Sequence, residues 1–243
     1  MNVLITGGSR GIGAAAVHAL HRDGHNVFFT YTSNAARADE LCSQIERIAC
    51  GRCDLADSAS LPALVARVIE RFGSIDVLIN NGAVFEDNPF FGNTYEAWMR
   101  GWERTFSINL FGTANLTYLV LQHMRERGSG KIVNIASRAA HRGELTVADY
   151  GASKAALVNF TKSIARACAP YGITAIAIAP GFIETDMASA DLQTRRAELE
   201  AEVPVGYIGS AEEVAEVIAF FASPRGDYAN GATIDLNGGS YVR

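Results

Sequence analysis

Tyr150 and Lys154 form the pair in this sequence whose types and spacing best suit proton transfer. They are four residues apart at the start of a predicted helix over Tyr150–Ala169, so their side chains share one helix face. A free phenol has a pKa near ~10, too high for ready proton exchange at neutral pH. A nearby ammonium stabilises the phenolate, and a fall of ~3 pKa units requires roughly 4 kcal/mol of differential interaction. The pair therefore predicts a tyrosine that exchanges a proton, although this spacing alone is common and usually carries no function.

Ser137 and Asn109 are the polar residues best suited to act with this pair. Ser137 follows the predicted strand Lys131–Ala136, thirteen residues before Tyr150. Ligands of doubly wound sheets lie beyond the carboxyl ends of the strands, so Ser137 is expected beside a substrate. Asn109 lies in the apolar part of a long predicted helix, where it could instead be a satisfied core amide or a residue that kinks the helix. The sequence predicts a catalytic site built from Asn109, Ser137, Tyr150 and Lys154.

A glycine-rich loop follows the first predicted strand, Val3–Thr6, and runs into an alanine-rich predicted helix. Its glycines fit G-x-x-x-G-x-G directly after the strand, and also G-x-G-x-x-A in a register displaced from the strand end. Glycine lets the backbone turn sharply and approach a ligand, while a helix N-terminus offers unpaired N–H groups. A tight turn between strand and helix is the alternative. The loop predicts dinucleotide binding by Gly7, Ser9, Arg10, Gly11, Ile12 and Gly13.

The end of the second predicted strand, Asn26–Tyr31, bears on which dinucleotide is bound. Enzymes that use NAD place Asp or Glu there to hold the ribose hydroxyls, but from the start of this strand no acid occurs before Asp39. Without that carboxylate, Arg10 and the hydroxyls of Thr32 and Ser33 could bind a 2′-phosphate. The sequence predicts NADP(H) as the cofactor.

Short apolar runs alternate with helix-period segments along the chain. The predicted strands are Val3–Thr6, Asn26–Tyr31, Arg47–Cys50, Ile75–Ile79, Lys131–Ala136, Thr174–Ala179 and Thr233–Leu236. The predicted helices are Ile12–Arg22, Ala35–Glu46, Ser60–Phe72, Tyr95–Arg127, Tyr150–Ala169 and Ala211–Ala222. Several strands are apolar on both faces, as expected of a parallel sheet covered by helices on each side. The pattern predicts a single α/β domain over residues 1–243: a Rossmann-type, doubly wound, mainly parallel seven-stranded sheet.

The composition excludes several classes of function. Of the 243 residues, 21 are Lys or Arg and 26 are Asp or Glu, which gives a net charge of −5. Nucleic acids and anionic membranes attract basic surfaces, so neither is expected as a partner. No segment approaches ~18 uninterrupted apolar residues, and the N-terminus lacks the charged and apolar regions of a secretory signal. We expect a cytoplasmic protein without a membrane span.

Cys50 and Cys53 match the C-x-x-C spacing of redox pairs and of half a zinc site. A redox pair normally opens a helix, whereas these residues lie at the end of a predicted strand. If that strand continues, side chains three apart face opposite sides of the sheet. No second cysteine pair or histidine pair completes a zinc ligand set. We expect neither redox chemistry nor a metal site.

The order and spacing of these motifs resemble the short-chain dehydrogenase/reductase family over nearly the whole chain. The positions that carry the resemblance are Gly7, Gly11, Gly13, Asp54, Asn80, Asn81, Asn109, Ser137, Tyr150, Lys154, Pro180 and Gly181. The resemblance implies further cofactor contacts at Asn81, Gly82, Tyr150, Lys154, Pro180, Gly181, Ile183 and Thr185.

The resemblance also implies a role for each polar residue. Ser137 would hydrogen-bond the substrate carbonyl, and Tyr150 would donate a proton to its oxygen as hydride arrives from NADPH. Lys154 would lower the pKa of the tyrosine and bind the nicotinamide ribose. Asn109 would hold a water that relays protons through this lysine, and Asp54 would accept a hydrogen bond from the adenine amino group.

The segment after the fourth predicted strand departs from the family pattern. The family usually has Asn-Asn-Ala-Gly there, whereas this chain has Asn80, Asn81, Gly82 and Ala83. The swap moves the flexible residue by one place, so we expect a change in how the backbone passes the cofactor ribose rather than loss of binding.

Within the family, the sequence resembles 3-oxoacyl-[acyl-carrier-protein] reductases. This predicts an NADPH-dependent carbonyl reductase acting on a 3-oxoacyl thioester. Two alternatives remain: a dehydrogenase or reductase of a secondary alcohol, sugar or secondary-metabolite ketone, and a non-catalytic NADP-binding sensor or scaffold. The intact set of four polar residues argues against the scaffold.

The expected binding partner, oligomeric state and lid follow from the resemblance. Carrier-protein docking in such reductases depends on basic residues, but Gly128 and Tyr171 stand where two of them would help, with Arg125 and Arg127 nearby. A homotetramer, or a homodimer, is expected through the long helices and the C-terminal strand. A lid is expected over residues 187–203, where an alanine- and glutamate-rich pattern follows the Pro180 turn.

Overall fold

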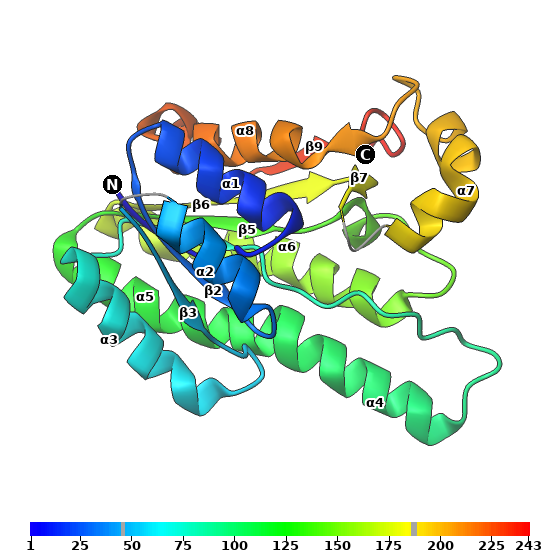
Figure 1. The fold of residues 1–243 in the computed structure, drawn as a ribbon, viewed down its shortest axis with the longest axis horizontal. Coiled ribbons are helices and arrows are strands. Elements are labelled where there is room, and N and C mark those ends of the chain that lie inside the picture. The colour runs from blue at the N-terminus through cyan, green and yellow to red at the C-terminus, as the bar shows by residue number, and fades with distance from the viewer. Residues whose placement is uncertain (45–46, 186–188) are drawn as a thin grey trace.

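A seven-stranded, wholly parallel sheet forms the centre of the protein, in the order β3-β2-β1-β4-β5-β6-β9 (Figure 1). The computed structural model describes the chain except residues 45–46 and 186–188. The strands are β1 (Asn2–Ile5), β2 (Asn26–Tyr31), β3 (Ile48–Arg52), β4 (Val77–Asn80), β5 (Gly130–Ile135), β6 (Ile173–Pro180) and β9 (Thr233–Leu236). The predicted doubly wound sheet is confirmed.

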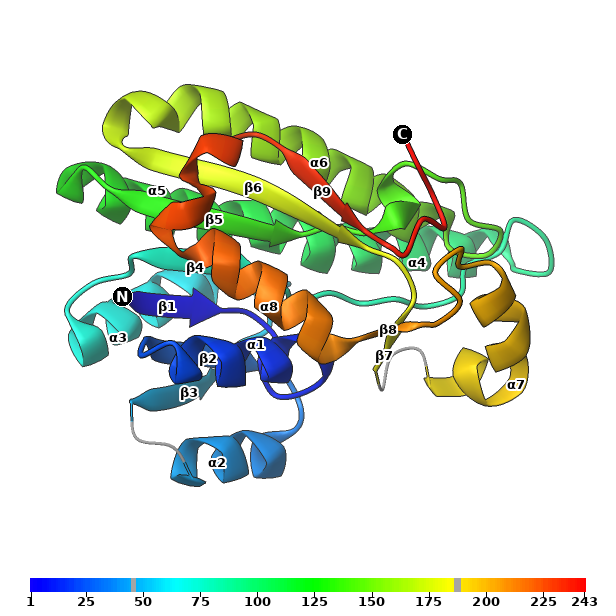
Figure 2. The ribbon, with the colours of Figure 1, turned by 90° about the horizontal axis from the view of Figure 1, so that it is seen from above.

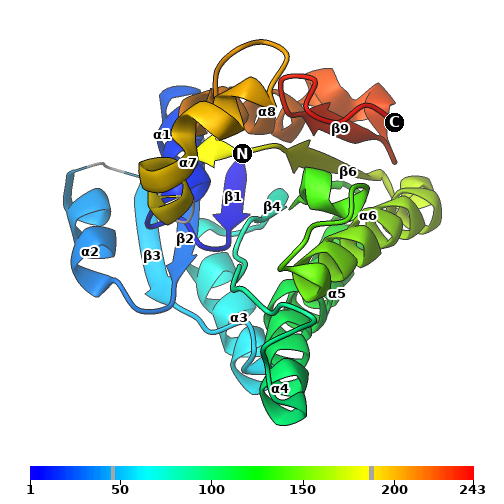
Figure 3. The same ribbon diagram turned by 90° about the vertical axis from the view of Figure 1, so that its right-hand side faces the viewer.

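Alternate residues of the strands supply two separate cores. In β1, Val3 and Ile5 join one buried cluster, whereas Leu4 joins the other. All three side chains are fully buried, because helices cover both faces of the sheet. Figures 2 and 3 show α1 and α8 side by side on one face, with α3, α5 and α6 on the other.

The helices largely match the predicted ranges. Their bounds are α1 (Gly11–Arg22), α2 (Ala35–Gln44), α3 (Leu61–Phe72), α4 (Tyr95–Phe106), α5 (Thr113–Arg127), α6 (Ala148–Cys168), α7 (Ser189–Ala201) and α8 (Ala211–Ala222). The single long helix predicted before β5 is interrupted by a π-helical turn, Ser107–Gly112, which separates α4 from α5. Asn109 lies inside this turn, in agreement with its interpretation as a residue that distorts the helix.

The strand order reverses between the neighbouring strands β1 and β4: β2 and β3 continue the sheet on one side, and β5, β6 and β9 continue it on the other. In doubly wound folds, ligands bind outside the carboxyl ends at this reversal. The glycine-rich loop follows β1, the Asn81–Gly82 segment follows β4, and Ser137 follows β5 with one residue between. The fold therefore brings the predicted site residues to one edge of the sheet.

A small second sheet, which was not predicted, begins shortly after the carboxyl end of β6. It pairs β7 (Ile183–Glu184) with β8 (Gly209–Ser210) in parallel. The helix α7 lies between these strands in sequence and is bent at Arg195, whose backbone angles are φ −130° and ψ 18°. The first residues of the expected lid, Met187 and Ala188, lie outside the described residues.

Cys50 and Cys53 lie on opposite faces of the sheet, as the strand prediction required. Cys50 packs against the cluster that contains α1, whereas Cys53 is buried in the cluster on the other face. All four cysteines are free thiols. Among the described residues, no helix is long and apolar enough to cross a membrane.

Candidate active site

Ser137, Tyr150 and Lys154 meet at the carboxyl edge of the sheet. Ser137 and Tyr150 share a side-chain hydrogen bond. The Lys154 ammonium lies 5.6 Å from the centroid of the tyrosine ring and donates to the carbonyl of Ile135 at 2.7 Å. Both helix residues project from the first two turns of α6, as their four-residue spacing predicted. The structure thus joins a phenol, a hydroxyl and a cation within reach of one reacting group.

Burial governs the charges of this cluster. It raises the pKa of Tyr150 to about 12, while the hydrogen bond with Ser137 acts in the opposite direction and the nearby Glu144 carboxylate adds to the rise. Burial also lowers the pKa of Lys154 to about 8. The expected depression of the tyrosine pKa by the lysine is not found in this structure, because the loss of hydration dominates and the opposing effect comes from Ser137 and not from Lys154.

Asn109 is 1% exposed, and its amide is held by protein groups. Its Oδ1 accepts from the backbone N–H of Val84 at 2.9 Å, and its Nδ2 donates to the carbonyl of Val84 at 3.0 Å. The same Nδ2 donates to Ser153 Oγ at 3.3 Å. Asn109 thus ties the segment after β4 to the helix that carries Tyr150.

Asn80 is buried in the interior of the protein. Its Nδ2 donates to Asn134 Oδ1 at 2.8 Å and to Thr117 Oγ1 at 2.9 Å. Asn134 in turn donates to Thr161 Oγ1 at 2.8 Å. This buried chain of amides and hydroxyls joins β4, β5, α5 and α6, and so fixes the helix of the candidate catalytic residues against the sheet.

The glycine-rich loop has the geometry of an anion cradle. Gly7 and Gly11 have φ angles of +68° and +52°, which favour glycine. A Cβ at Gly13 would lie 2.1 Å from the carbonyl oxygen of Gly7, so a side chain cannot be accommodated there. The loop ends at the N-terminus of α1, whose N–H groups favour a negative charge. Ser9 is buried, Arg10 is exposed and Ile12 is partly buried.

Asn81 and Gly82 hold this loop from the end of β4. The Asn81 side chain donates to the carbonyls of Thr6 and Gly7, each at 3.0 Å. The backbone N–H of Gly82 donates to Thr6 Oγ1 at 2.8 Å, and a Cβ on Gly7 would lie 2.9 Å from the Cα of Gly82. Gly82 therefore lies in close contact with the glycine-rich loop.

The end of β2 presents hydroxyls and no acid. Thr32 and Ser33 are both exposed, and Thr32 Oγ1 donates to the carbonyl of Cys53 at 3.3 Å. Asp54 is exposed and accepts from the N–H of Ala56 at 2.9 Å. These residues follow β2 and β3, so they share the carboxyl edge with the glycine-rich loop.

Arg52 is a basic residue at this edge that the sequence analysis did not select. Its Nε donates to the carbonyl of Thr32 at 3.1 Å. Pairing of β2 with β3 brings them together, because Tyr31 lies opposite Arg52 in the register. Only that register, which the sequence does not show, could have indicated the contact.

The segment after β6 completes the edge. Pro180 is the last residue of β6, and the N–H of Gly181 donates to the carbonyl of Leu236 at 3.0 Å. Ile183 is buried. A Cβ on Gly11 would lie 3.2 Å from Thr185 Cγ2, so this segment touches the glycine-rich loop.

Two further features of the site, besides Arg52, lie outside the residues that the sequence analysis selected. The Phe85 ring meets the ring of Tyr150 edge-on, with centroids 5.0 Å apart and an interplanar angle of 89°. Asp149 is 1% exposed and accepts from Thr105 Oγ1 at 2.9 Å. The only sequence signal for Asp149 was that it is an acidic residue at the start of a helix. Within the described part of the chain, no cluster of His, Cys, Asp and Glu could hold a metal ion.

Known proteins resemble the chain over almost its full length. A family model described as enoyl-(acyl carrier protein) reductase matches residues 7–241. The 3-oxoacyl-[acyl-carrier-protein] reductase FabG of Escherichia coli (strain K12) is 37% identical over 242 residues, which cover 98% of this chain and 96% of that protein. The acetoacetyl-CoA reductase of Rhizobium meliloti (strain 1021) is 37% identical over 239 residues, which cover 98% and 97%.

Solved structures agree with the sequence relatives. A short-chain dehydrogenase/reductase from Brucella melitensis, titled glucose/ribitol dehydrogenase, has a TM-score of 0.91 and 34% identity, covering 100% of this chain and 97% of that chain. A mutant of a Serratia marcescens short-chain dehydrogenase/reductase, in which leucine replaces two phenylalanines, has a TM-score of 0.90 and 31% identity, covering 99% and 98%. The fold and the edge of polar residues define a Rossmann-type α/β oxidoreductase. The chain belongs to the short-chain dehydrogenase/reductase family.

Replacement of Lys154 by Met should stabilise the protein at pH 7, because burial lowers the pKa of this lysine to about 8 and a buried ammonium disfavours folding. Loss of the hydrogen bond to Ile135 offsets part of the gain. Between pH 8 and the ordinary lysine pKa of 10.5 the unfolded chain binds more protons, so wild-type stability rises with pH and the variant lacks this rise.

Urea denaturation of the two proteins near pH 7 and near pH 9.5 measures the difference, which should shrink at the higher pH. Lys162→Met, at an exposed position of the same helix, is the matched control and should change neither value. Equal pH slopes for the wild type and Lys154→Met would contradict the lowered pKa.

Proposed function

We propose that the chain is an NADPH-dependent carbonyl reductase whose substrate is a 3-oxoacyl thioester. The observation that carries the proposal is the cluster of Ser137, Tyr150 and Lys154, in which a phenol shares a hydrogen bond with a hydroxyl and lies beside a buried ammonium. Relatives named 3-oxoacyl-[acyl-carrier-protein] reductase and acetoacetyl-CoA reductase support the substrate class.

In the proposed reaction, Ser137 and Tyr150 both hydrogen-bond to the ketone oxygen. Ser137 Oγ accepts from the N–H of Ala139 at 3.1 Å, and its hydroxyl hydrogen, which faces Tyr150 here, would turn to the ketone oxygen when the substrate binds. Tyr150 transfers its phenolic proton to the oxygen as negative charge develops there. Bound NADPH supplies the hydride.

The pKa values suit reduction. The raised pKa of Tyr150 keeps the phenol protonated, as a proton donor requires. After transfer, the Lys154 ammonium stabilises the phenolate by its charge. With its pKa lowered to about 8, Lys154 can also pass on a proton near neutral pH. We assign Asn109 the role of holding a water that supplies this lysine, through the lone pair of Oδ1 that Val84 leaves free.

The residues present fit a dinucleotide. The glycine-rich loop folds back tightly on itself, with Gly13 packed against the carbonyl of Gly7, and it ends at a helix N-terminus whose N–H groups suit a phosphate. Gly7, Ser9, Gly11, Ile12 and Gly13 would hold the pyrophosphate; Arg10, Thr32 and Ser33 the 2′-phosphate; Asp54 the adenine; and Asn81, Gly82, Tyr150, Lys154, Pro180, Gly181, Ile183 and Thr185 the nicotinamide half. The exposed Arg10 and the absence of an acid at the end of β2 favour NADP(H) over NAD(H).

Introduction of an acid at the end of β2 should reverse the cofactor preference. Thr32→Asp should weaken NADPH binding by about 10-fold or more, because a carboxylate repels the 2′-phosphate, and should favour NADH. Thr32→Asn, of the same shape without the charge, should keep the preference for NADPH.

Fluorescence titration with each dinucleotide gives the two dissociation constants, and the ratio of kcat/KM values gives an independent readout. A ratio that Thr32→Asp leaves unchanged would refute the assignment of Thr32 to the phosphate site.

Removal of the phenolic hydroxyl should abolish turnover without abolishing cofactor binding. Tyr150→Phe should lower kcat for acetoacetyl-CoA by about 1000-fold or more, because the developing oxyanion loses its proton donor. The dissociation constant for NADPH should stay within about threefold of wild type, since a single hydroxyl is lost.

The same assay discriminates among substrates. NADPH oxidation is followed with acetoacetyl-CoA, crotonyl-CoA, free ketones, quinones and sugars, and acetoacetyl-CoA should be preferred. Reduction of crotonyl-CoA alone would favour the enoyl reductase named in the family description. Oxidation of a sugar alcohol would favour the dehydrogenase alternative. Undiminished turnover by Tyr150→Phe would remove this residue as the acid.

We propose that the thioester is carried by coenzyme A or by an acyl carrier protein that does not rely on the usual basic residues. At the end of α5, Gly128 has a φ of +69° and terminates the helix. Tyr171 lies beneath Arg125, whose guanidinium carbon is 5.0 Å from the ring centroid. Of the two arginines at this end of α5, Arg125 is thus packed on an aromatic ring, and Arg127 pairs with Asp76 at 2.9 Å.

We also propose that the segment 187–203 covers the substrate, with residues 186–188 outside the described part. Its C-terminal end is attached to the loop after β5, because Glu202 pairs with Arg138 at 3.7 Å and with Arg142 at 3.5 Å. The four free thiols fit a reducing compartment such as the cytoplasm.

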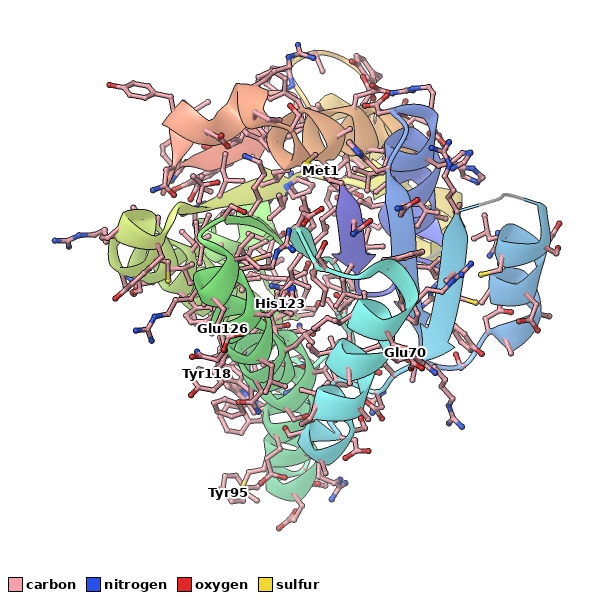
Figure 4. The ribbon with its side chains drawn as sticks, turned by 90° about the vertical axis from the view of Figure 1, so that its left-hand side faces the viewer. Met1, Glu70, Tyr95, Tyr118, His123 and Glu126 are labelled. Atoms are coloured by element: carbon pink, nitrogen blue, oxygen red, sulfur yellow. The ribbon has the colours of Figure 1, made fainter. Side chains whose placement is uncertain are left out.

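We propose a homotetramer, or a homodimer, that forms through α4 and α5. Tyr95 on α4, Phe111 in the π-helical turn and Tyr118 on α5 are each more than half exposed, so that on a monomer these large apolar side chains would face water. Figure 4 shows Tyr95 and Tyr118 on the outer side of the two helices, with Glu126 further along the same side.

A charge on this surface should dissociate the assembly. Phe111→Glu should shift the mass measured by light scattering towards a smaller species, because burial of a carboxylate is unfavourable. Phe111→Leu, which remains apolar, should retain the wild-type mass. A wild-type protein that is monomeric at micromolar concentration would contradict the proposal.

A further inference from the structure

A buried carboxylate lies directly before Tyr150 in the chain. Asp149 is 1% exposed, and its Oδ2 accepts from Thr105 Oγ1 at 2.9 Å and from Asn88 Nδ2 at 3.4 Å. Its Oδ1 accepts from the backbone N–H of Tyr150 at 2.9 Å. Burial of a carboxylate is unfavourable unless hydrogen bonds replace its hydration. Here the donors come from three segments: α4, the loop after β4, and α6 itself.

Asn88 is the second centre of this buried cluster. It is 5% exposed, its Nδ2 also donates to the carbonyl of Trp98 at 3.0 Å, and its backbone N–H donates to the carbonyl of Thr146 at 2.7 Å. A Cβ at Gly101 would lie 2.4 Å from Asn88 Nδ2, so α4 approaches the amide closely at a glycine. The side chain of Asn93 donates to Asn88 Oδ1 at 3.0 Å. Every polar group of the Asn88 side chain is thus bound.

The segment that Asn88 anchors lies against two candidate catalytic residues. Residues 84–88 form the start of the teal loop that runs from β4 towards the right of Figure 1 before the chain turns back into α4. Val84 bonds through both its N–H and its carbonyl to the side chain of Asn109. Phe85 packs edge-on against the ring of Tyr150. The loop, α4 and the first turn of α6 therefore share one set of buried contacts.

We propose that Asp149 is a positioning residue for Tyr150: through Thr105 and Asn88 it fixes the first turn of α6 against α4 and the 84–88 segment, and so sets where the phenol and Phe85 meet the substrate. This inference rests on the proposed role of Tyr150 as the proton donor. A carboxylate suits the position because it only accepts hydrogen bonds, and all three neighbouring groups donate. It also lies in the first turn of a helix, where the dipole favours negative charge.

Thr105 provides the sharpest test, because it lies on another helix and its hydroxyl bonds to Asp149, the residue before Tyr150. Thr105→Val keeps the shape and removes the hydroxyl, whereas Thr105→Ser keeps the hydroxyl. We expect Thr105→Val to lower kcat for acetoacetyl-CoA by about 10- to 100-fold, the loss typical of a misplaced catalytic group. Its KM and its dissociation constant for NADPH should stay within about threefold of wild type, and Thr105→Ser should restore kcat.

Asp149→Asn is the second variant. The asparagine amide has an NH2 group, which would face one of the three groups that donate hydrogen bonds to Asp149. It should lower kcat in the same way at a temperature well below the melting temperature of either variant. Cofactor titration and thermal melts of each variant monitor folding.

A kcat of Thr105→Val within about twofold of Thr105→Ser would overturn the positioning role. A parallel loss of NADPH affinity, KM and melting temperature in both Thr105→Val and Asp149→Asn would also overturn it in favour of a purely structural one. A wild-type protein that does not reduce acetoacetyl-CoA would refute the proposed function, and the ratio of kcat values of Thr105→Val and Thr105→Ser on the substrate that is turned over would then support or overturn the positioning role.

Discussion

The buried Lys154 ammonium is the constraint on which the rest of the site depends. It is 3% exposed, and the carbonyl of Ile135 at the end of β5 accepts its hydrogen bond at 2.7 Å. This contact joins α6 to the sheet at the place where Ser137 follows the strand. Burial lowers the pKa of the lysine and raises that of Tyr150, which keeps the phenol protonated and makes the ammonium easier to deprotonate than a free lysine. The arrangement sacrifices stability to place a charge where the reaction needs one.

Further layers of contacts support this pair. The buried chain from Asn80 through Asn134 to Thr161 fixes α6 on the sheet, and the π-helical turn directs Asn109 towards Val84 and Ser153. On the outer side, Asp149 joins the start of α6 to α4. The candidate active site is therefore held by polar contacts from strands, helices and a loop, and its geometry does not depend on one element.

Much of this could be predicted from the sequence, because the signals are local. Apolar runs and glycine spacing define the strands and the loop over Gly7–Gly13, and a parallel sheet brings the carboxyl ends of its strands to one edge. The contacts of Asp149 with Thr105 and Asn88 could not be predicted, since they join residues 44 and 61 positions apart. The rise in the pKa of Tyr150 was also missed, because spacing reveals the neighbouring charge but not the extent of burial.

Hydride transfer to the ketone carbon is the central claim, and isotope tracing tests it most directly. NADPH that carries deuterium at the transferable position of the nicotinamide is incubated with the protein and acetoacetyl-CoA, and the product is examined by NMR. The account predicts one deuterium at C3 of a 3-hydroxybutyryl thioester, on the carbon that bore the oxygen. A 3-hydroxy product without deuterium at C3, or deuterium transfer only to the double bond of crotonyl-CoA, would contradict it.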